Sequence, residues 1–271
     1  MENVYLCTNK EKLKTMQLAV QRRIKILDML REDGHVRVND LSKVFEVTEV
    51  TIRQDLEKME QEGLLRRVHG GAVLLDTDRH VENLMVINRN HQKEKEAIAR
   101  EAVKHIKDGD TIILDSGSTT TEIANLLVSG FQDLNVITNA LNIALIIGAN
   151  PSINVNVTGG EFKQPTLSLT GQRAADYFQG LHANTLFLAT AGIDIDDGLT
   201  YPSMSDLPVK KAMIESANKV YLVADSSKIG HCAFATLGSI SLVDTIITDK
   251  GISDEDRLTL GKYKVECILA E

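Results

Sequence analysis

Residues 47–71 have the sequence VTEVTIRQDLEKMEQEGLLRRVHGG, which predicts a helix followed by a hairpin. Thr48 can cap this helix, because its hydroxyl can accept a hydrogen bond from an amide of the first turn. Gly63 can end the helix in the left-handed conformation, which suits a residue without Cβ. The apolar residues that we expect to pack inward are Val50, Ile52, Leu56 and Met59, with Leu64 and Leu65 beyond the helix.

The outward face of this helix is polar, and a basic tip follows it. Thr51, Arg53 and Gln54 on that face are expected to contact DNA base edges, since arginine and glutamine can bond to bases through two atoms at once. The tip precedes a tight turn predicted at Gly70-Gly71. Contacts with the DNA backbone are expected from Lys58, Arg66, Arg67 and His69. With the cap included, the predicted DNA-binding residues are Thr48, Thr51, Arg53, Gln54, Lys58, Arg66, Arg67 and His69.

Two more helices are predicted before this stretch. Apolar residues recur at helical spacing over residues 18–31, and Asp33-Gly34 ends that helix. After an extended piece at 35–38, Asn39 can cap a second helix with Leu41, Val44 and Phe45 facing inward. Two helices, a short turn at 46–48 and a third helix make a helix-turn-helix. The hairpin at 64–75 makes it a winged helix.

Length and composition favour two domains in a soluble protein. With 271 residues the chain can hold more than one core. We divide it into an N-terminal extension (1–17), a winged helix-turn-helix domain (18–75), a linker (76–92) and an α/β domain (93–271). No apolar run approaches the roughly 18 residues of a membrane span, and the N-terminus lacks a signal peptide core. We therefore expect a cytoplasmic protein without membrane association.

The charge is divided unevenly along the chain. The net charge is −8, but residues 1–75 hold 13 of the 30 Lys and Arg and 12 of the 38 Asp and Glu, so the acidic excess belongs to the rest. A nearly neutral head on an acidic body is consistent with DNA binding by the head alone. Cys7, Cys232 and Cys267 are far apart and lack metal-ligand spacing, so we expect reduced cysteines and neither a metal site nor a cofactor.

From residue 93 onward, predicted helices and strands alternate. This pattern with apolar strands indicates a parallel sheet covered on both faces. The strands are expected at 111–114, 136–138, 153–158, 185–190, 219–224, 244–248 and 264–269, and the helices at 93–106, 121–127, 140–147, 172–179 and 207–217.

Ligands of such sheets bind beyond the carboxyl ends of the strands. The loop at 115–120, DSGSTT, offers hydroxyls, amides and a helix N-terminus, which together favour a phosphate, although an ordinary capping turn has the same composition. Asp206 and Lys210 lie one helical turn apart and can face one site, or can form a surface pair. The predicted effector-binding residues are Asp115, Ser116, Gly117, Ser118, Thr119, Thr120, Thr138, Asn139, Gly192, Asp194, Asp206, Lys210, Ser226 and Lys228. Lysines would pair with phosphate and carboxylates with hydroxyls of a phosphorylated sugar or polyol.

These segments together resemble a known family. TEVTIRQDLEKMEQEGLLRRVHGGAVL is similar to the N-terminal signature of DeoR-type bacterial transcriptional regulators. LDSGSTTTEIA, VITNALNIA, SLTGQRA, AGID, VKKAMIESA and ADSSKIG resemble its effector domain in the same order, so the resemblance extends from about residue 18 to 250. It implies a fold related to ribose-5-phosphate isomerase and sugar-phosphate deaminases, and a phosphorylated sugar or catabolic intermediate as ligand.

The chain departs from the family pattern in three places, one of them a pair of residues. Gln54 stands where a second arginine is usual, which affects the operator sequence because arginine favours guanine and glutamine favours adenine. Ala189-Thr190 replaces a more polar stretch before AGID, and Asp206 replaces a glutamate. Both of these departures lie where sugar specificity would be set.

We therefore predict a transcriptional regulator that represses a sugar or polyol catabolic operon. One head makes few DNA contacts, so we expect a homo-oligomer, either dimer or tetramer, on paired half-sites of double-stranded operator DNA. A phosphorylated sugar would release the protein from its operator. The alternative is a sugar-phosphate isomerase or deaminase-like enzyme with an accessory DNA-binding domain, for which Asp115, Asp194 and Asp225 are the candidate bases. The DNA-binding head favours the regulator, which is not an enzyme.

Overall fold

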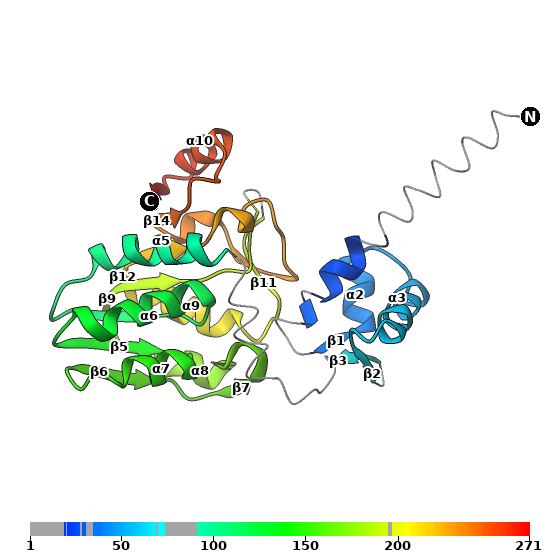
Figure 1. Ribbon diagram of the computed structural model, residues 1–271, viewed down its shortest axis with the longest axis horizontal. Helices are drawn as coiled ribbons and strands as arrows, with labels where there is room; N and C mark the ends of the chain where they lie inside the picture. The colour runs from blue at the N-terminus through cyan, green and yellow to red at the C-terminus, as the bar shows by residue number, and fades with distance from the viewer. Residues whose placement is uncertain are drawn as a thin grey trace, which may run out of the picture. The chain divides into compact units, whose positions relative to one another are not determined.

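The structure is a computed structural model that describes residues 19, 21–27, 29–30, 35–68, 70–73, 91–194 and 197–271. Contacts divide the chain into two compact units, Met1–Asn83 and Leu84–Glu271 (Figure 1). The expected linker at 76–92 lies mostly outside the described residues. Within the described ranges, no helix has both the length and the apolar character that a membrane span requires.

The smaller unit is a winged helix-turn-helix domain. Residues 21–27 are helical and precede β1 (His35–Arg37), α2 (Val38–Val44), α3 (Glu49–Gln61), β2 (Arg66–Val68) and β3 (Gly71–Val73). The three strands form an antiparallel sheet in the order β1-β3-β2, which is visible in Figure 1. The core contains Ile26, Leu30, Leu41, Ile52, Leu56, Met59 and Leu65. The fold of the head is as predicted.

Local chemistry sets the ends of α3. Thr48 is the N-cap, and its hydroxyl accepts a hydrogen bond from the Thr51 amide at 3.3 Å. Gly63 follows the last turn with a φ of 72°, the left-handed conformation expected from its position. Asp55 is buried on the inner face, where the Arg22 guanidinium donates to it at 2.6 Å. This ion pair joins the first helical segment to α3, and the sequence pattern alone did not reveal it.

Four predictions about the head were wrong. Val50 is exposed, because the inner face of α3 runs through Ile52, Asp55, Leu56 and Met59, and a residue two positions before Ile52 points away from it. Leu64 is also largely exposed. Helix α2 begins at Val38, so Asn39 is not its cap, and Val44 at its last position faces outward.

The larger unit contains the predicted parallel sheet. Its strands are β4 (Thr111–Leu114), β5 (Leu134–Thr138), β6 (Ile153–Val157), β9 (Ala183–Leu188), β12 (Ala217–Val223), β14 (Thr245–Thr248) and β15 (Glu266–Leu269). They form a seven-stranded sheet in the order β15-β14-β12-β9-β4-β5-β6, and every neighbouring pair is parallel. The carboxyl ends of β9, β4 and β5 therefore lie side by side.

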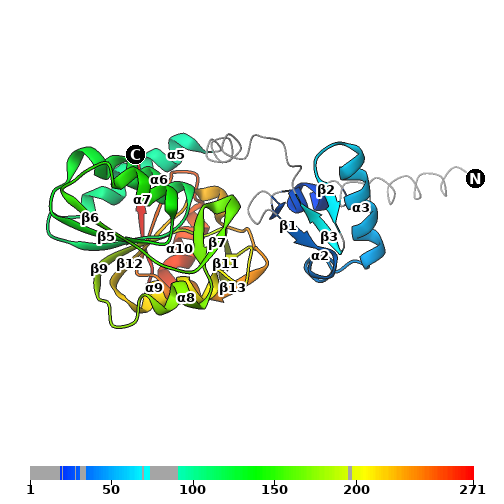
Figure 2. The same cartoon turned by 90° about the horizontal axis from the view of Figure 1, so that it is seen from below.

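Helices cover both faces of this sheet. On one face lie α5 (Gln92–Ala102), α6 (Ser118–Gly130) and α7 (Leu141–Ile147), and on the other lie α8 (Gln172–Asp176), α9 (Leu207–Glu215) and α10 (Asp254–Lys262), as Figure 2 shows for most of them. A separate apolar core fills each side, with Ile98, Leu114 and Ile123 in the first and Leu186, Met213 and Leu260 in the second. The predicted α/β architecture is confirmed.

Several short elements were not predicted. They include the hairpin of β7 (Glu161–Lys163) and β8 (Ser168–Thr170), and a small sheet of β10 (Gly192–Asp194), β11 (Gly198–Tyr201) and β13 (Ala235–Gly238). Strands of three or four residues are too short to show periodicity, and α10 begins with three acidic residues that hide its pattern. Helix α6 begins at Ser118, not at Thr121, so residues 118–120 form its first turn.

Candidate functional site

The outer face of α3 carries exposed polar side chains, among them Arg53 and Gln54. Arg53 is exposed and its Nη2 donates to Glu49 Oε2 at 2.7 Å, one turn earlier. Gln54 lies beside it and is also exposed. Thr51 is half-buried, and its Oγ1 lies 3.0 Å from Thr48 Oγ1, so these two hydroxyls are bonded to each other at the helix start. Arg53 and Gln54 are therefore more available for contacts with DNA bases than Thr51, the third predicted base-contacting residue.

The wing lies next to α3 and carries exposed basic residues. Arg66 and Arg67 on β2 are exposed, as is Lys58 on α3. The Arg67 amide donates to Glu60 Oε1 at 2.7 Å, which ties the wing to the helix. The structure thus brings the described members of the predicted set together, while His69 lies outside the described residues.

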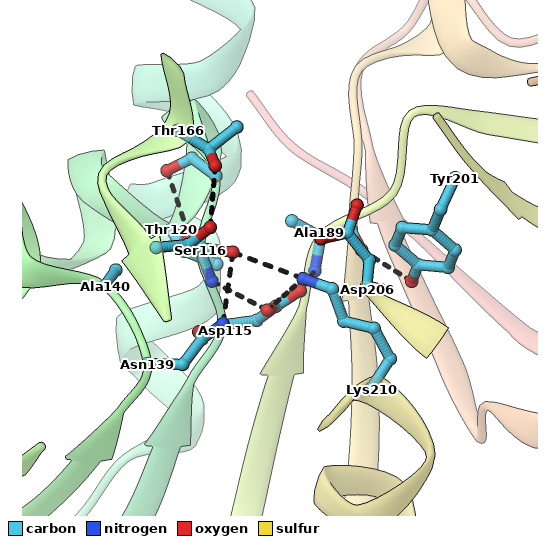
Figure 3. A network of polar contacts seen from close by, with 12 residues as sticks. Asp115, Ser116, Thr120, Asn139, Ala140, Thr166, Ala189, Tyr201, Asp206 and Lys210 are labelled. Atoms are coloured by element: carbon cyan, nitrogen blue, oxygen red, sulfur yellow. Dashed lines mark hydrogen bonds and ion pairs between the residues drawn. The ribbon is translucent and has the colours of Figure 1, made fainter. Parts of the chain in front are cut away.

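In the larger domain, Asp115 is the centre of a buried polar network (Figure 3). Its Oδ1 accepts hydrogen bonds from Lys210 Nζ and, at 2.7 Å, from the Ser116 amide. Its Oδ2 accepts from the Ala189 amide at 3.0 Å. Burial raises the pKa of the Asp115 carboxyl, and the Lys210 ammonium group opposes this rise. The network joins the ends of β4 and β9 to α9.

Asn139 extends the network to the end of β5. Its Nδ2 donates to Leu169 O at 3.1 Å and lies 3.5 Å from Ser116 Oγ. Its Oδ1 is buried, and it has no hydrogen-bond partner among the described residues. A buried acceptor without a partner is costly. This oxygen is available to a donor group such as a ligand hydroxyl.

Asp206 and Lys210 both lie in the interior, so their interpretation as a surface pair was wrong. Asp206, just before α9, accepts from Lys163 Nζ of β7 at 2.9 Å, and both side chains are largely buried. Lys210 also donates to Ser116 Oγ at 3.3 Å, and its Nζ lies 5.3 Å from the centre of the Tyr201 ring. Burial raises the pKa of Tyr201, and the nearby Asp115 adds to the rise.

The predicted phosphate loop is partly occupied by its own contacts. Thr120 and Thr121 donate their hydroxyls to Gly117 O at 3.0 and 2.7 Å, so both hydroxyls bond back to the carbonyl at the start of α6. Gly117 packs tightly, since a Cβ there would lie 2.6 Å from Ala189 Cβ. Ser118 and Thr119 lie in the first turn of α6, whose amides point to the helix start. Thr138 accepts from the Ala140 amide at 3.1 Å, which is a structural role.

The remaining predicted residues make contacts of their own. Gly192 and Asp194 belong to β10, where Asp194 Oδ1 accepts from the Asp197 amide at 2.9 Å. A Cβ at Gly192 would meet His231 O at 2.2 Å, so glycine serves close packing there. Ser226 bonds to Asp249 at the end of β14, through its amide at 2.6 Å and its hydroxyl at 2.8 Å. None of these contacts involves the Asp115 network.

A second buried cluster contains Lys95, which sequence analysis missed. Lys95 lies on α5 and is only 5% exposed. Burial lowers its pKa, Asp225 opposes this shift, and the nearby ammonium group of Lys228 adds to it. The Glu122 carboxylate of α6 also opposes the lowering of the Lys95 pKa, and Gln92 Nε2 donates to Glu122 Oε1 at 3.0 Å. Lys95 precedes the buried Ile98 by three residues, so its inward position was the signal that could have revealed it.

Two family models match consecutive parts of the chain. A model described as the DeoR-like helix-turn-helix domain matches residues 22–78, and one described as the DeoR C terminal sensor domain matches residues 90–250. The HTH-type transcriptional regulator YulB of Bacillus subtilis (strain 168) is 36% identical and aligns over 92% of this chain and 96% of its own. The glycerol-3-phosphate regulon repressor of Escherichia coli (strain K12) is 31% identical, over 84% and 90%. IolR of Bacillus subtilis (strain 168), another HTH-type transcriptional regulator, is 31% identical over 88% and 94%.

Solved structures show a weaker likeness. A D-ribose-5-phosphate isomerase in complex with phospho-erythronic acid aligns with 51% of this chain and 54% of its own, at 18% identity and a TM-score of 0.39. An eIF2B delta structure from Chaetomium thermophilum aligns with 84% of this chain and 70% of its own, at 16% identity and a TM-score of 0.42. The fold is defined by the strand order and the two helical layers of the larger domain.

Proposed function

The chain belongs to the DeoR family of transcriptional regulators, and we propose that it is a repressor whose larger domain binds a phosphorylated sugar or polyol. The observation that carries the proposal is that one chain combines an exposed polar helix face with a buried polar site. Exposed Arg53 and Gln54 on α3 suit DNA bases, and the buried lysines Lys95 on α5 and Lys210 on α9 suit an anionic, polar ligand. Such a regulator acts on DNA in the cytoplasm.

The phosphate is assigned to the cluster of Lys95 and Lys228. The ammonium group of Lys228 contributes to lowering the pKa of Lys95, because two positive charges repel each other. A phosphate between them relieves this repulsion. Thr119 lies three residues before Glu122 and so shares its helix face, which places the first turn of α6 beside the cluster. Amides of a helix N-terminus favour an anion in this position.

The sugar or polyol hydroxyls are assigned to the Asp115 network. Asn139 Oδ1 can accept a hydrogen bond, and the Lys163–Asp206 pair can exchange bonds with hydroxyls. Lys210 donates to Ser116 Oγ in the same network. A ligand with several hydroxyls and one phosphate matches these donors and acceptors.

The contacts of the candidate bases favour binding over catalysis. A general base must be able to take a proton from the substrate. Asp115 already accepts bonds from Lys210 and two amides, and Asp225 accepts bonds from the amide and hydroxyl of Ser227. Asp194 lies in β10, and its Oδ1 accepts a bond from the Asp197 amide. These contacts support a regulator, and turnover of the ligand would support the isomerase- or deaminase-like alternative.

DNA binding is tested by selection from random-sequence duplexes with the full-length protein. We expect an enriched operator sequence, bound by a homo-oligomer on paired half-sites. Arg53→Ala should lose about 1–3 kcal/mol of discrimination at one base pair. Arg100→Ala, at an exposed position of the larger domain, is the matched control and should bind like the wild type. Failure to enrich any sequence would contradict the proposal.

Ligand binding is tested by thermal unfolding of the full-length protein with a panel of sugar and polyol phosphates. A ligand at about 100 times its Kd should stabilise the protein by about 2.7 kcal/mol. Lys95→Met should abolish this effect, while Lys104→Met should keep it, because Lys104 is exposed and lies beyond the same helix. Equal stabilisation of both variants would refute the assignment of the phosphate to Lys95.

A further inference from the structure

Val50 has no packing role that accounts for its position. It lies in the first turn of α3 and is 59% exposed, more than any other large apolar side chain in the described part of the head. Single exposed apolar residues are common on protein surfaces. Val50, however, lies on the same helix face as the residues proposed to contact DNA.

The neighbours of Val50 place it at the leading end of that face. Arg53 and Gln54 follow it by three and four residues, so all three side chains lie in one row. Thr51 beside it is half-buried and bonded to Thr48 through its hydroxyl. In helix-turn-helix proteins, the first residues of the recognition helix contact base edges in the major groove. Val50 occupies such a position.

Only one chemical group on the base edges suits this side chain. Valine cannot donate or accept a hydrogen bond. In the major groove, the C5-methyl group of thymine is the one apolar feature that the base pairs offer. We propose that Val50 is a specificity-determining residue that contacts the C5-methyl group of a thymine. This inference rests on the proposed DNA-binding function and adds a preference that the polar residues of α3 do not supply.

The test uses the full-length protein and the operator obtained by selection from random duplexes. Each thymine of the operator is replaced in turn by uracil, which removes only the methyl group. The wild type should bind about four-fold more weakly when the contacted methyl is removed, since one buried methylene-sized group contributes about 0.8 kcal/mol. Val50→Ala should bind the operator with uracil at that position as tightly as it binds the operator with thymine. Val50→Thr keeps one methyl group and nearly the same shape, so it should still lose part of its affinity when that thymine is replaced by uracil.

Val44→Ala is the matched control. Val44 is also an exposed valine of the head, at the end of α2, and its variant should keep the full four-fold effect. If Val50→Ala keeps the wild-type sensitivity at every thymine, or if no thymine is sensitive in the wild type, the role of Val50 is refuted although the DNA-binding function stands. If no sequence is selected at all, the proposed function itself fails.

Discussion

At the scale of single residues, the larger domain depends on a buried charge pair. Asp115 is fully buried and Lys210 is 3% exposed, so each neutralises the other in the interior. Two backbone amides and Ser116 satisfy most of the remaining polar atoms. A buried pair of this kind tolerates the joint removal of both charges better than the removal of one.

The first prediction concerns this pair. Lys210→Met should lower the free energy of unfolding by about 3–5 kcal/mol, because it leaves the Asp115 carboxylate buried without its cation. Asp115→Asn combined with Lys210→Met should recover most of that loss. Chemical denaturation of the full-length proteins measures both, with Lys211→Met at the exposed neighbouring position as the control. A double variant as unstable as the single one would contradict this account.

The second prediction concerns the pH dependence of ligand binding. Burial places the pKa of Lys95 below the ordinary value of 10.5, and a bound phosphate would raise it again. Binding therefore takes up a proton, and affinity should fall as the pH rises through the lowered pKa. The phosphate itself titrates at about pH 6, so it stays a dianion throughout this range. Calorimetry in buffers of rising pH should show the fall in the wild type and in Lys104→Met, and no ligand binding at any pH in Lys95→Met.

At the scale of elements, the wing depends on one close approach between strands. Gly71 pairs with Arg37 across β1 and β3, and a Cβ at Gly71 would lie 1.9 Å from Val36 O. No side chain fits there unless the strands separate. The turn before β3 also needs glycine, since Gly70 has a φ of 79°.

The third prediction follows from this contact. Gly71→Ala should displace β3, destabilise the head and weaken DNA binding, while ligand binding by the larger domain stays at the wild-type level. Gly261→Ala near the end of α10 is the control, because its Cβ meets nothing within 4 Å. Tryptic digestion and DNA binding together measure the effect. A Gly71→Ala protein with a wild-type head would show that the wing tolerates the extra atom.

Elements were predictable from sequence where local signals decide them. The cap at Thr48, the glycine after α3 and the strand β4 all follow from their own residues. Val50 was wrongly predicted to be buried because it is apolar, although its position in the helical repeat turns it away from the inner face of α3. The Lys163–Asp206 pair joins residues 43 positions apart, and Lys95 meets Asp225 and Lys228 only after the sheet forms. No local pattern contains such contacts.

At the scale of the whole molecule, the two units have different chemistry. The head presents exposed arginines and a nearly balanced charge, while the acidic excess lies in the larger domain. A ligand changes DNA binding only if it favours one state of the protein over another. Helix α5 begins just after residues 76–90 and contributes Lys95 to the proposed phosphate site. A phosphate at the proposed site would therefore contact the first helix that the structure describes after the head.

The fourth prediction tests the central claim, that a phosphorylated ligand controls DNA binding, most directly. Fluorescence anisotropy measures the binding of the full-length protein to its selected operator while the panel of sugar and polyol phosphates is titrated in. One phosphate ester should weaken operator binding by about 5- to 150-fold, the usual range of coupling between two sites. The same compound without its phosphate should have no effect, and Lys95→Met should bind the operator without responding. An operator affinity that no phosphate ester changes, or a Lys95→Met protein that responds like the wild type, would contradict the account.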